Sequence, residues 1–276
     1  MIHLKSKSEI DTIARAGSII GGLVREVESH IVPGATTGQL DTFCEDYIRS
    51  HEGAVPAFKG LYGFPGSVCI SMNEEVVHGI PSPKRVLSEG DIVSVDIGVK
   101  LEGWCSDAAW TFAVGAIDDE AQKLLRVTEE ALDRAIESAR AGRHVGDIGA
   151  AVVGTVKGTG LGIIRELVGH GVGRDVHEEP QVPNVGRPGY GPMLREGMVI
   201  AIEPMLSAGT DMVKTLDDRW TVVTADGSRS AHFEHTVAIT DNGPRILTLP
   251  LVSQGNGQDR APDRGKSLDR ARADLA

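Results

Sequence analysis

The feature that most constrains the fold is an internal repeat: the hydrophobic pattern predicts two helices followed by strands, and then the same order again. Three short segments recur in the same order and at similar offsets. They are Pro33–Gly38, 108 residues before Ala141–Gly146; Leu87–Asp96, 107 residues before Leu194–Glu203; and His78–Pro81, 99 residues before His177–Pro180. The repetition predicts a duplicated α+β unit with a pseudo-twofold axis. We therefore expect Asp96 to lie near Glu203, and His78 near His177.

Apolar residues at helical spacing and short apolar runs predict the individual elements. The helices are expected from Ser6, which has capping-box spacing to Glu9, to the break at Pro33-Gly34, from about Thr36 to Ile48, from Leu124 to Ile136, and from near Gly146 onward. The strands are expected in SVCISM, DIVSVDIGV and AAWTFAV of the first half and in GMVIAIEPML, RWTVVTA and EHTVAIT of the second.

Composition excludes several classes of protein. With 41% hydrophobic and 24% charged residues, the chain is typical of globular proteins, and its formal charge of −11 argues against nucleic-acid binding through bulk charge. It has neither an apolar run of about 18 residues nor the apolar stretch of a signal peptide, so we expect no membrane segment. Cys44, Cys69 and Cys105 show no paired spacing, which favours a reducing, cytoplasmic setting. We expect a folded domain over residues 1–252 and a disordered charged tail over 253–276.

Paired carboxylates carry the clearest chemical signal. In VDIGVKLEGWCSDAAW, Asp96 and Asp107 lie on the two strands of a predicted hairpin. If its turn is centred between Leu101 and Glu102, the two aspartates are directly opposite, with Cβ atoms roughly 5 Å apart. Like charges at that distance need solvent or a cation, and both alternatives remain open for an isolated hairpin.

Three further residues favour the cation. Glu203 ends the apolar run of GMVIAIEP, so it should be buried and needs a basic partner or a metal ion. Taken alone, Glu234 favours the surface, and His170, in a predicted Gly-rich turn VGHGVG, favours a hydrogen-bonding role. Four carboxylates and one imidazole together exceed what one ion usually needs and suit two ions that share bridging carboxylates.

Five segments resemble those of type I methionine aminopeptidases, a family with the pita-bread metallopeptidase fold. They are GFPGSVCISMNEEVVHGIP, SVDIGVKLEGWCSDAAWTFAVG, ELVGHGVGRDVHEEPQVPN, LREGMVIAIEPM and SAHFEHTVAIT, and the resemblance covers residues 5 to 251. It implies a pseudo-twofold, duplicated α+β fold with a central curved antiparallel sheet and helices on its outer face.

The resemblance also implies roles for individual residues. Asp96, Asp107, His170, Glu203 and Glu234 match the ligands of a dinuclear site for divalent ions (Co, Mn, Fe or Zn), which activates a water as a hydroxide nucleophile. Glu203 is the expected proton shuttle. His177 is expected to donate to the carbonyl oxygen, and His78 to contact the scissile nitrogen or a flanking amide.

The resemblance also implies a small apolar pocket for an unbranched thioether side chain. Its lining residues would be Tyr62, Phe64, Cys69, His78 and Trp220. Cys69 is expected as a pocket wall rather than a nucleophile, while core packing remains an alternative for Phe64 and Trp220. The implied function is co-translational removal of the N-terminal methionine when the second residue is small and uncharged. The expected partners are nascent chains at the ribosome, and the expected state is a monomer without direct nucleic-acid readout.

Two alternatives remain open. The chain could be an Xaa-Pro aminopeptidase or prolidase with the same ligands, although those relatives usually carry a large extra N-terminal domain. It could also be a pita-bread binding protein that has lost catalysis, although such proteins lose ligands and all five are present here.

Overall fold

The computed structural model describes residues 2–249, so the predicted tail at 253–276 and the end of the predicted domain lie outside the described residues. The helices are α1 (Lys7–Val27), α2 (Thr37–Arg49), α3 (Asp119–Ser138) and α4 (Val145–Val156), with 3₁₀ turns η1 (Glu28–His30) and η2 (Leu61–Gly63). The strands of the first half are β1 (Ala54–Pro56), β2 (Cys69–Met72), β3 (Glu75–Val77), β4 (Ile92–Leu101) and β5 (Trp104–Ala113). Those of the second are β6 (Gly162–Ile163), β7 (Val168–Gly171), β8 (Glu178–Pro183), β9 (Val199–Ile202), β10 (Met205–Ser207), β11 (Val213–Thr215), β12 (Val222–Thr224), β13 (Ser230–His232), β14 (His235–Thr240) and β15 (Gly243–Ile246).

Local capping explains where the helices begin. Ser6 and Glu9 form the predicted capping box at the start of α1, and Thr36 forms one with Gln39 at the start of α2. Asp118 caps α3 by accepting a hydrogen bond from the backbone N–H of Ala121. All four predicted helices are confirmed, although α3 begins earlier than its apolar pattern indicated.

Every strand pair in the described part of the chain is antiparallel, as expected. Hydrogen bonding divides the strands into four sheets. The larger sheet of the first half has the order β1-β4-β2 with β5 also on β4, and that of the second half has the order β15-β14-β9-β7-β8. Two three-stranded sheets, β13-β10-β6 and β11-β12-β3, complete the arrangement.

The two halves join where β5 meets the segment that links β13 to β14. The backbone N–H of Glu234 donates to the carbonyl of Ala109 (2.9 Å). On one side of this bond, the Thr236 hydroxyl accepts from the N–H of Asp107 and donates to its carbonyl. On the other side, the Thr111 hydroxyl makes the same two bonds to the backbone of His232. This antiparallel seam brings carboxylates of both halves to the middle of the molecule.

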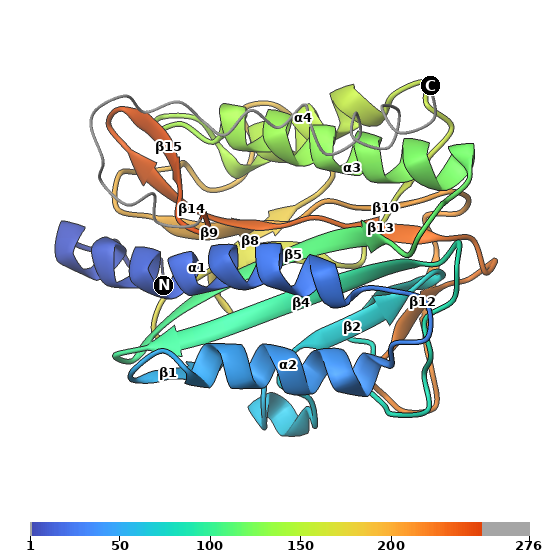
Figure 1. Ribbon diagram of the computed structural model, residues 1–276. Helices are drawn as coiled ribbons and strands as arrows, with labels where there is room; N and C mark the ends of the chain where they lie inside the picture. The colour runs from blue at the N-terminus through green and yellow to red at the C-terminus, as the bar shows by residue number, and fades with distance from the viewer. Residues whose placement is uncertain (1, 250–276) are drawn as a thin grey trace, which may run out of the picture.

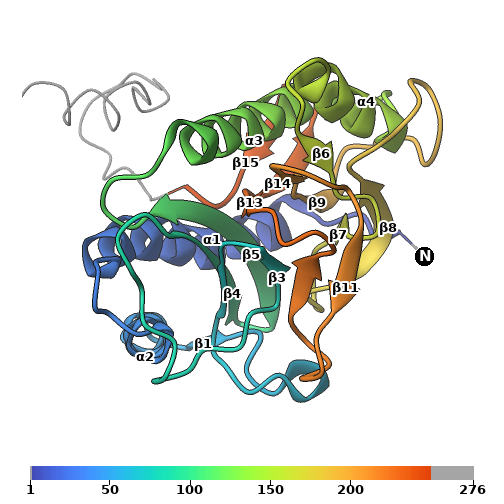
Figure 2. The ribbon, with the colours of Figure 1, turned by 90° about the vertical axis from the view of Figure 1, so that its right-hand side faces the viewer.

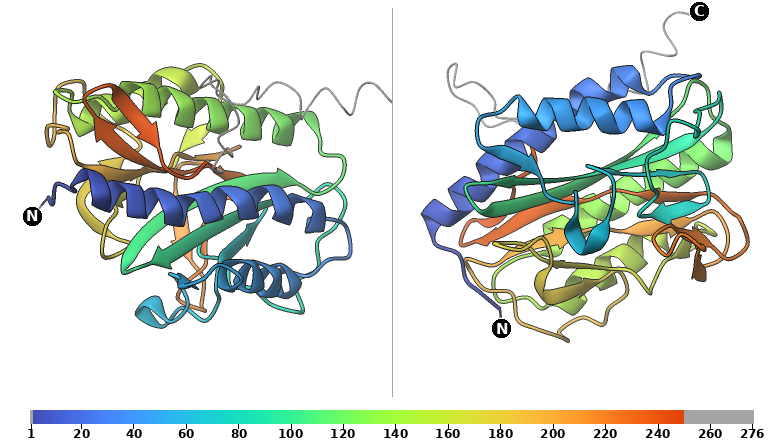
Figure 3. Two further views of the ribbon diagram at one scale, coloured as in Figure 1. Left: turned by 60° about the vertical axis from the view of Figure 1, so that its left-hand side comes forward. Right: turned by 90° about the horizontal axis from the view of Figure 1, so that it is seen from below.

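The helices lie on the outer side of the strands (Figures 1 and 2). α1 runs along β4 and β5 (Figure 3, left), and its apolar face packs with α2 in one core. α3 and α4 pack on the strands of the second half in another core. None of the helices between residues 2 and 249 is long and apolar enough to cross a bilayer.

Candidate active site

The β4–β5 hairpin places two carboxylates on one face, but in a different register from the predicted one. Asp96 pairs with Ala109, and Asp107 pairs with Gly98. The prediction that the two aspartates are directly opposite is therefore wrong. Its cause is the turn, which is centred between Glu102 and Gly103, both with positive φ (50° and 79°).

Moving the turn by one residue shifts the cross-strand pairing by two, and a shift of two keeps the same face. Asp96 and Asp107 are thus diagonal neighbours on one face of the hairpin, and the Asp96 carboxylate contributes to a raised pKa of Asp107.

The second half brings its own acids to this face. Glu203 directly follows β9, and Glu234 lies between β13 and β14. Both are buried, as is Asp107, so Glu234 does not take the surface position that its own strand, taken by itself, favours. Its burial follows from the seam, where its backbone pairs with Ala109 at the centre of the molecule.

Burial dominates the electrostatics of these acids. It raises the pKa of Asp96 to about 7, a rise that His232 opposes and Glu203 increases. Asp96 and Glu203 line the same cavity, in agreement with the proximity that the repeat predicts. Burial also raises the pKa of Asp107 and Glu234 well above their ordinary values, with neighbouring carboxylates contributing further. For Glu203, burial acts in the same direction but is outweighed by the His232 and His170 rings, which lower its pKa.

His170 lies on β7 rather than in the predicted turn. The glycines around it serve close packing between strands: a Cβ at Gly169 would lie 2.4 Å from the carbonyl oxygen of Ala201, and one at Gly171 would lie 2.2 Å from that of Glu179. The Nδ1 of His170 is 2.9 Å from the carbonyl oxygen of Gly171, so it carries the ring proton. Nε2 then keeps a free lone pair toward Asp107 (3.8 Å) and Glu203 (3.5 Å).

Sequence reasoning missed His232, which is buried beside the acids. Its Nε2 lies 3.3 Å from Oε2 of Glu203 and 3.9 Å from Oε2 of Glu234. The available signal was spacing: His232 is two residues before Glu234, which in extended chain places both side chains on one face.

The donor atoms fit divalent cations. Ligand atoms of Asp107, His170 and Glu234 lie within 4.8 Å of one another, as do those of Glu203, His232 and Glu234. Asp96 belongs to neither group but adjoins Asp107. Among the described residues, one carboxylate oxygen each of Asp96, Asp107 and Glu234 is buried without a hydrogen-bond partner. Buried anionic oxygens without partners are costly, and hard cations with oxygen ligands relieve that cost.

The two histidines implied by the repeat lie at the same cavity, His78 just after β3 and His177 just before β8. Burial lowers the pKa of His78 and, together with His170, lowers the pKa of His177 to about 4. Both imidazoles are therefore neutral at pH 7. The His177 ring packs edge-on against the His170 ring at 4.5 Å between centroids.

A cavity of about 570 Å³ opens onto these groups. All five predicted pocket residues line it, although Tyr62 is 77% exposed and stacks beside His177 at the mouth. Phe64 and Trp220 pack edge-to-face at 5.1 Å, so they contact each other and also face the cavity. Burial raises the pKa of the Cys69 thiol well above its ordinary value, which suits a wall and not a nucleophile.

Known proteins share this architecture. The model of metallopeptidase family M24 matches residues 11–241. The methionine aminopeptidase of Clostridium acetobutylicum is 53% identical over 249 residues, covering 90% of this chain and 99% of its own. The methionine aminopeptidase structure from Thermotoga maritima superposes with a TM-score of 0.88 at 47% identity, over 90% of this chain and all of that one.

The prolidase structure from Pyrococcus furiosus is less similar, with a TM-score of 0.72 at 25% identity over 90% of this chain and 66% of that one. A family match over most of the sequence, a shared fold and a metal-compatible acid cluster agree with one another. The chain belongs to metallopeptidase family M24, alongside the methionine aminopeptidases, and is a metal-dependent aminopeptidase.

Proposed function

We propose that the protein removes the N-terminal methionine from peptides and nascent proteins whose second residue is small and uncharged. The observation that carries the proposal is the junction of the acid cluster with an apolar cavity that two neutral histidines border. A methionine side chain in that cavity would lie against Phe64, Cys69 and Trp220, which offer no charge. The nascent chain at the ribosome is the proposed partner, the cytoplasm the proposed setting, and a monomer the proposed state.

Asp96, Asp107, His170, Glu203 and Glu234 are the proposed ligands of two divalent cations, with Co, Mn, Fe and Zn as candidates. Such cations, when bound, supply Lewis acidity and a water acidic enough to react at neutral pH. Glu203, whose carboxylate lies 3.5 Å from Nε2 of His170 and 3.3 Å from Nε2 of His232, would hold a proton during the reaction and pass it to the leaving amine.

His177 is proposed to stabilise the transition state. A neutral imidazole has one N–H donor, which can bond the carbonyl oxygen as negative charge develops there. Because burial lowers the pKa of His177 to about 4, the ring is neutral at pH 7 and keeps one N–H that can donate to that oxygen. His78, on the opposite side of the cavity, would bind the scissile nitrogen or a flanking amide.

Cleavage of defined peptides after metal removal and reloading tests the proposal. The stripped protein should be inactive and should recover cleavage of Met-Ala-Ser with at least one of Co, Mn, Fe or Zn. Met-Leu-Ser and Met-Arg-Ser should be cleaved poorly, because a closed wall rejects a large side chain by steric clash. Preferential hydrolysis of Ala-Pro would instead support a prolidase-like function, and loss of all cleavage with metal bound would support a binding protein.

A further inference from the structure

A buried ion pair ties the segment before α1 to the residue that follows His177. The Nζ of Lys5 lies 2.7 Å from Oε2 of Glu178, and the two side chains are only 3% and 14% exposed. The partners are 173 residues apart in sequence. Figure 2 shows the N-terminal segment passing beside β8, the strand that begins at Glu178.

The other carboxylate oxygen of Glu178 holds the loop that leads to His177. Oε1 accepts the backbone N–H of Arg174 at 2.8 Å and that of Asp175 at 3.4 Å. The loop wraps closely around this oxygen, because a Cβ at Gly173 would lie only 2.2 Å from it. Glu178 is thus bonded to Lys5 on one side and to the loop on the other.

The position of Lys5 is itself fixed by backbone contacts. Its N–H donates to the carbonyl of Gly197 at 2.7 Å, and a Cβ at Gly197 would lie 2.9 Å from the Lys5 carbonyl oxygen. Gly197 comes two residues before β9, the strand that leads into Glu203. The N-terminal segment therefore links the loop of His177 to the strand of a proposed metal ligand.

A charge as buried as that of Lys5 needs its partner. Removing one member of a buried ion pair leaves the other charge without compensation, whereas neutralising both members is much less harmful. With Lys5 neutral, the Glu178 carboxylate would be drawn toward solvent, and the loop bonded to it would move with it. Displacement of a catalytic group by 1 Å can reduce the rate by about 10²-fold.

We propose that Lys5 is a positioning residue for His177: it holds the Glu178 carboxylate, which holds the loop from Gly173, so that the imidazole faces the reacting carbonyl. The proposal rests on the proposed function, in which His177 contacts the substrate. Lys5 does not line the cavity, so it would act on His177 only through Glu178.

The test compares Lys5→Met with Arg15→Met in full-length, metal-loaded protein. Arg15 pairs with Glu102, but both side chains are about half exposed, so this control removes a positive charge from a surface pair and not from a buried one. For Lys5→Met we expect kcat on Met-Ala-Ser to fall by between about tenfold and 10²-fold with an unchanged metal content. Arg15→Met should leave kcat unchanged.

A second measurement separates positioning from general stability. Hydrogen–deuterium exchange of the amides of Arg174 and Asp175 should become faster in Lys5→Met and not in Arg15→Met. In a His177→Ala background, Lys5→Met should cause no further loss of kcat, because the group that it positions is absent. The double variant Lys5→Met/Glu178→Gln should recover part of the lost rate, because the introduced amide side chain keeps an oxygen for the loop N–H groups and carries no charge.

Two results would overturn the inference. One is a Lys5→Met variant whose melting temperature falls but whose kcat, assayed well below that temperature, is normal. The other is an equal further loss of kcat in the His177→Ala background. In both cases cleavage of Met-Ala-Ser by the wild-type protein would leave the proposed function intact, whereas a wild-type protein without that activity would remove the function itself.

Discussion

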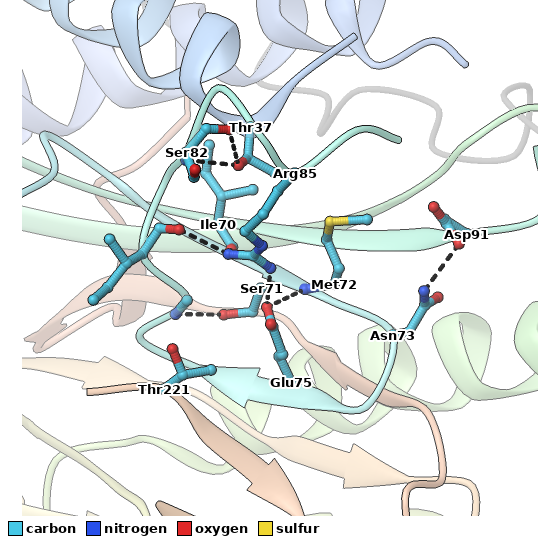
Figure 4. Close-up of polar contacts among 12 residues, drawn as sticks. Thr37, Ile70, Ser71, Met72, Asn73, Glu75, Ser82, Arg85, Asp91 and Thr221 are labelled. Carbon is cyan, nitrogen blue, oxygen red and sulfur yellow. Dashed lines mark hydrogen bonds and ion pairs between the residues drawn. The ribbon is translucent and has the colours of Figure 1, made fainter. Parts of the chain in front are cut away.

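The two halves hold their proposed catalytic histidines in different ways. In the first half, the Arg85 guanidinium bonds the carbonyl oxygens of Ile70 (3.2 Å) and Ile80 (2.8 Å) and contacts the Glu75 carboxylate, so it ties the loop after His78 to β2 and β3 (Figure 4). In the second half, Glu178 is bound by Lys5 from the other end of the chain.

The first anchor is local and the second is not. Arg85 and Glu75 are 10 residues apart, whereas Lys5 and Glu178 are 173 apart. The proposed metal ligands follow the same division, because one hairpin supplies Asp96 and Asp107 while separate segments supply those of the second half. The second half therefore depends on a contact that forms only when the whole chain is folded.

The largest expected effect comes from the hairpin that supplies two ligands. Asp107→Asn should abolish cleavage of Met-Ala-Ser and reduce bound metal, because a neutral amide is a much weaker ligand for a divalent cation than a carboxylate is. The amount of bound metal is measured by metal analysis and by the rise in melting temperature when Mn is added. The melting temperature reports binding because a ligand that binds the folded state stabilises it. His170→Ala, which removes a proposed ligand from the second half, is the variant to compare with Asp107→Asn.

The fold should survive Asp107→Asn, because the substitution removes a like charge beside Asp96. Circular dichroism of the metal-free variant checks this. Normal metal content with normal activity would contradict the placement of Asp107 in the site.

Substitution of the two cavity histidines, His78 and His177, should have the next largest effect on cleavage. His177→Ala should lower kcat by about 10²-fold, the scale for loss of one oxyanion donor, with a smaller change in KM. Metal content should stay the same for His177→Ala and His78→Ala, which steady-state kinetics and metal analysis test together. A variant that loses its metal would show that the histidine is a ligand.

Smaller still is the expected effect of the local anchor. Arg85→Met should lower kcat by less than about tenfold, because the loop of His78 keeps two other bonds to β2. The N–H of Gly79 donates to the Ser71 hydroxyl (3.1 Å), and the N–H of Ile70 donates to the carbonyl of Gly79 (2.9 Å). If Arg85→Met were more harmful than Lys5→Met, the contrast between the two anchors would be wrong.

The smallest effect concerns a surface cluster of the first half. The Lys59 ammonium, Arg49 and the Ser67 hydroxyl lower the pKa of Glu45 to about 2. A carboxyl group whose pKa is lower in the folded state stabilises the fold above its ordinary pKa of about 4.5, and the stabilisation disappears as the pH falls toward 2.

Glu45→Gln should therefore lower the free energy of unfolding by at most about 1 kcal/mol at pH 7, the range for surface ion pairs. Urea unfolding at pH 7 and below pH 4.5 measures the difference, which should shrink at the lower pH. A difference that grows on acidification would contradict the assigned direction of the pKa shift.

Features that depend on near neighbours were predictable. The capping boxes at Ser6 and Thr36 follow from residues three apart, and the shared face of Asp96 and Asp107 follows from strand alternation. The exact register of that hairpin could not be predicted, because Glu102 adopts a positive φ that its residue type does not demand. His170 was misplaced for a related reason: glycines that allow close packing of strands look in sequence like glycines of a turn.

By itself, the sequence determined the α+β architecture and the residues of the acid cluster apart from His232, because hydrophobic periodicity and residue spacing can be read from short segments. Only the tertiary structure decided that Glu234 is buried, that His232 faces Glu203, and that Lys5 holds the carboxylate next to His177. These contacts join residues far apart in the chain, and each depends on the depth of burial at the seam or beside β8. The type of a residue and its neighbours in sequence do not indicate how deeply it is buried, because that burial arises only when the two halves pack together.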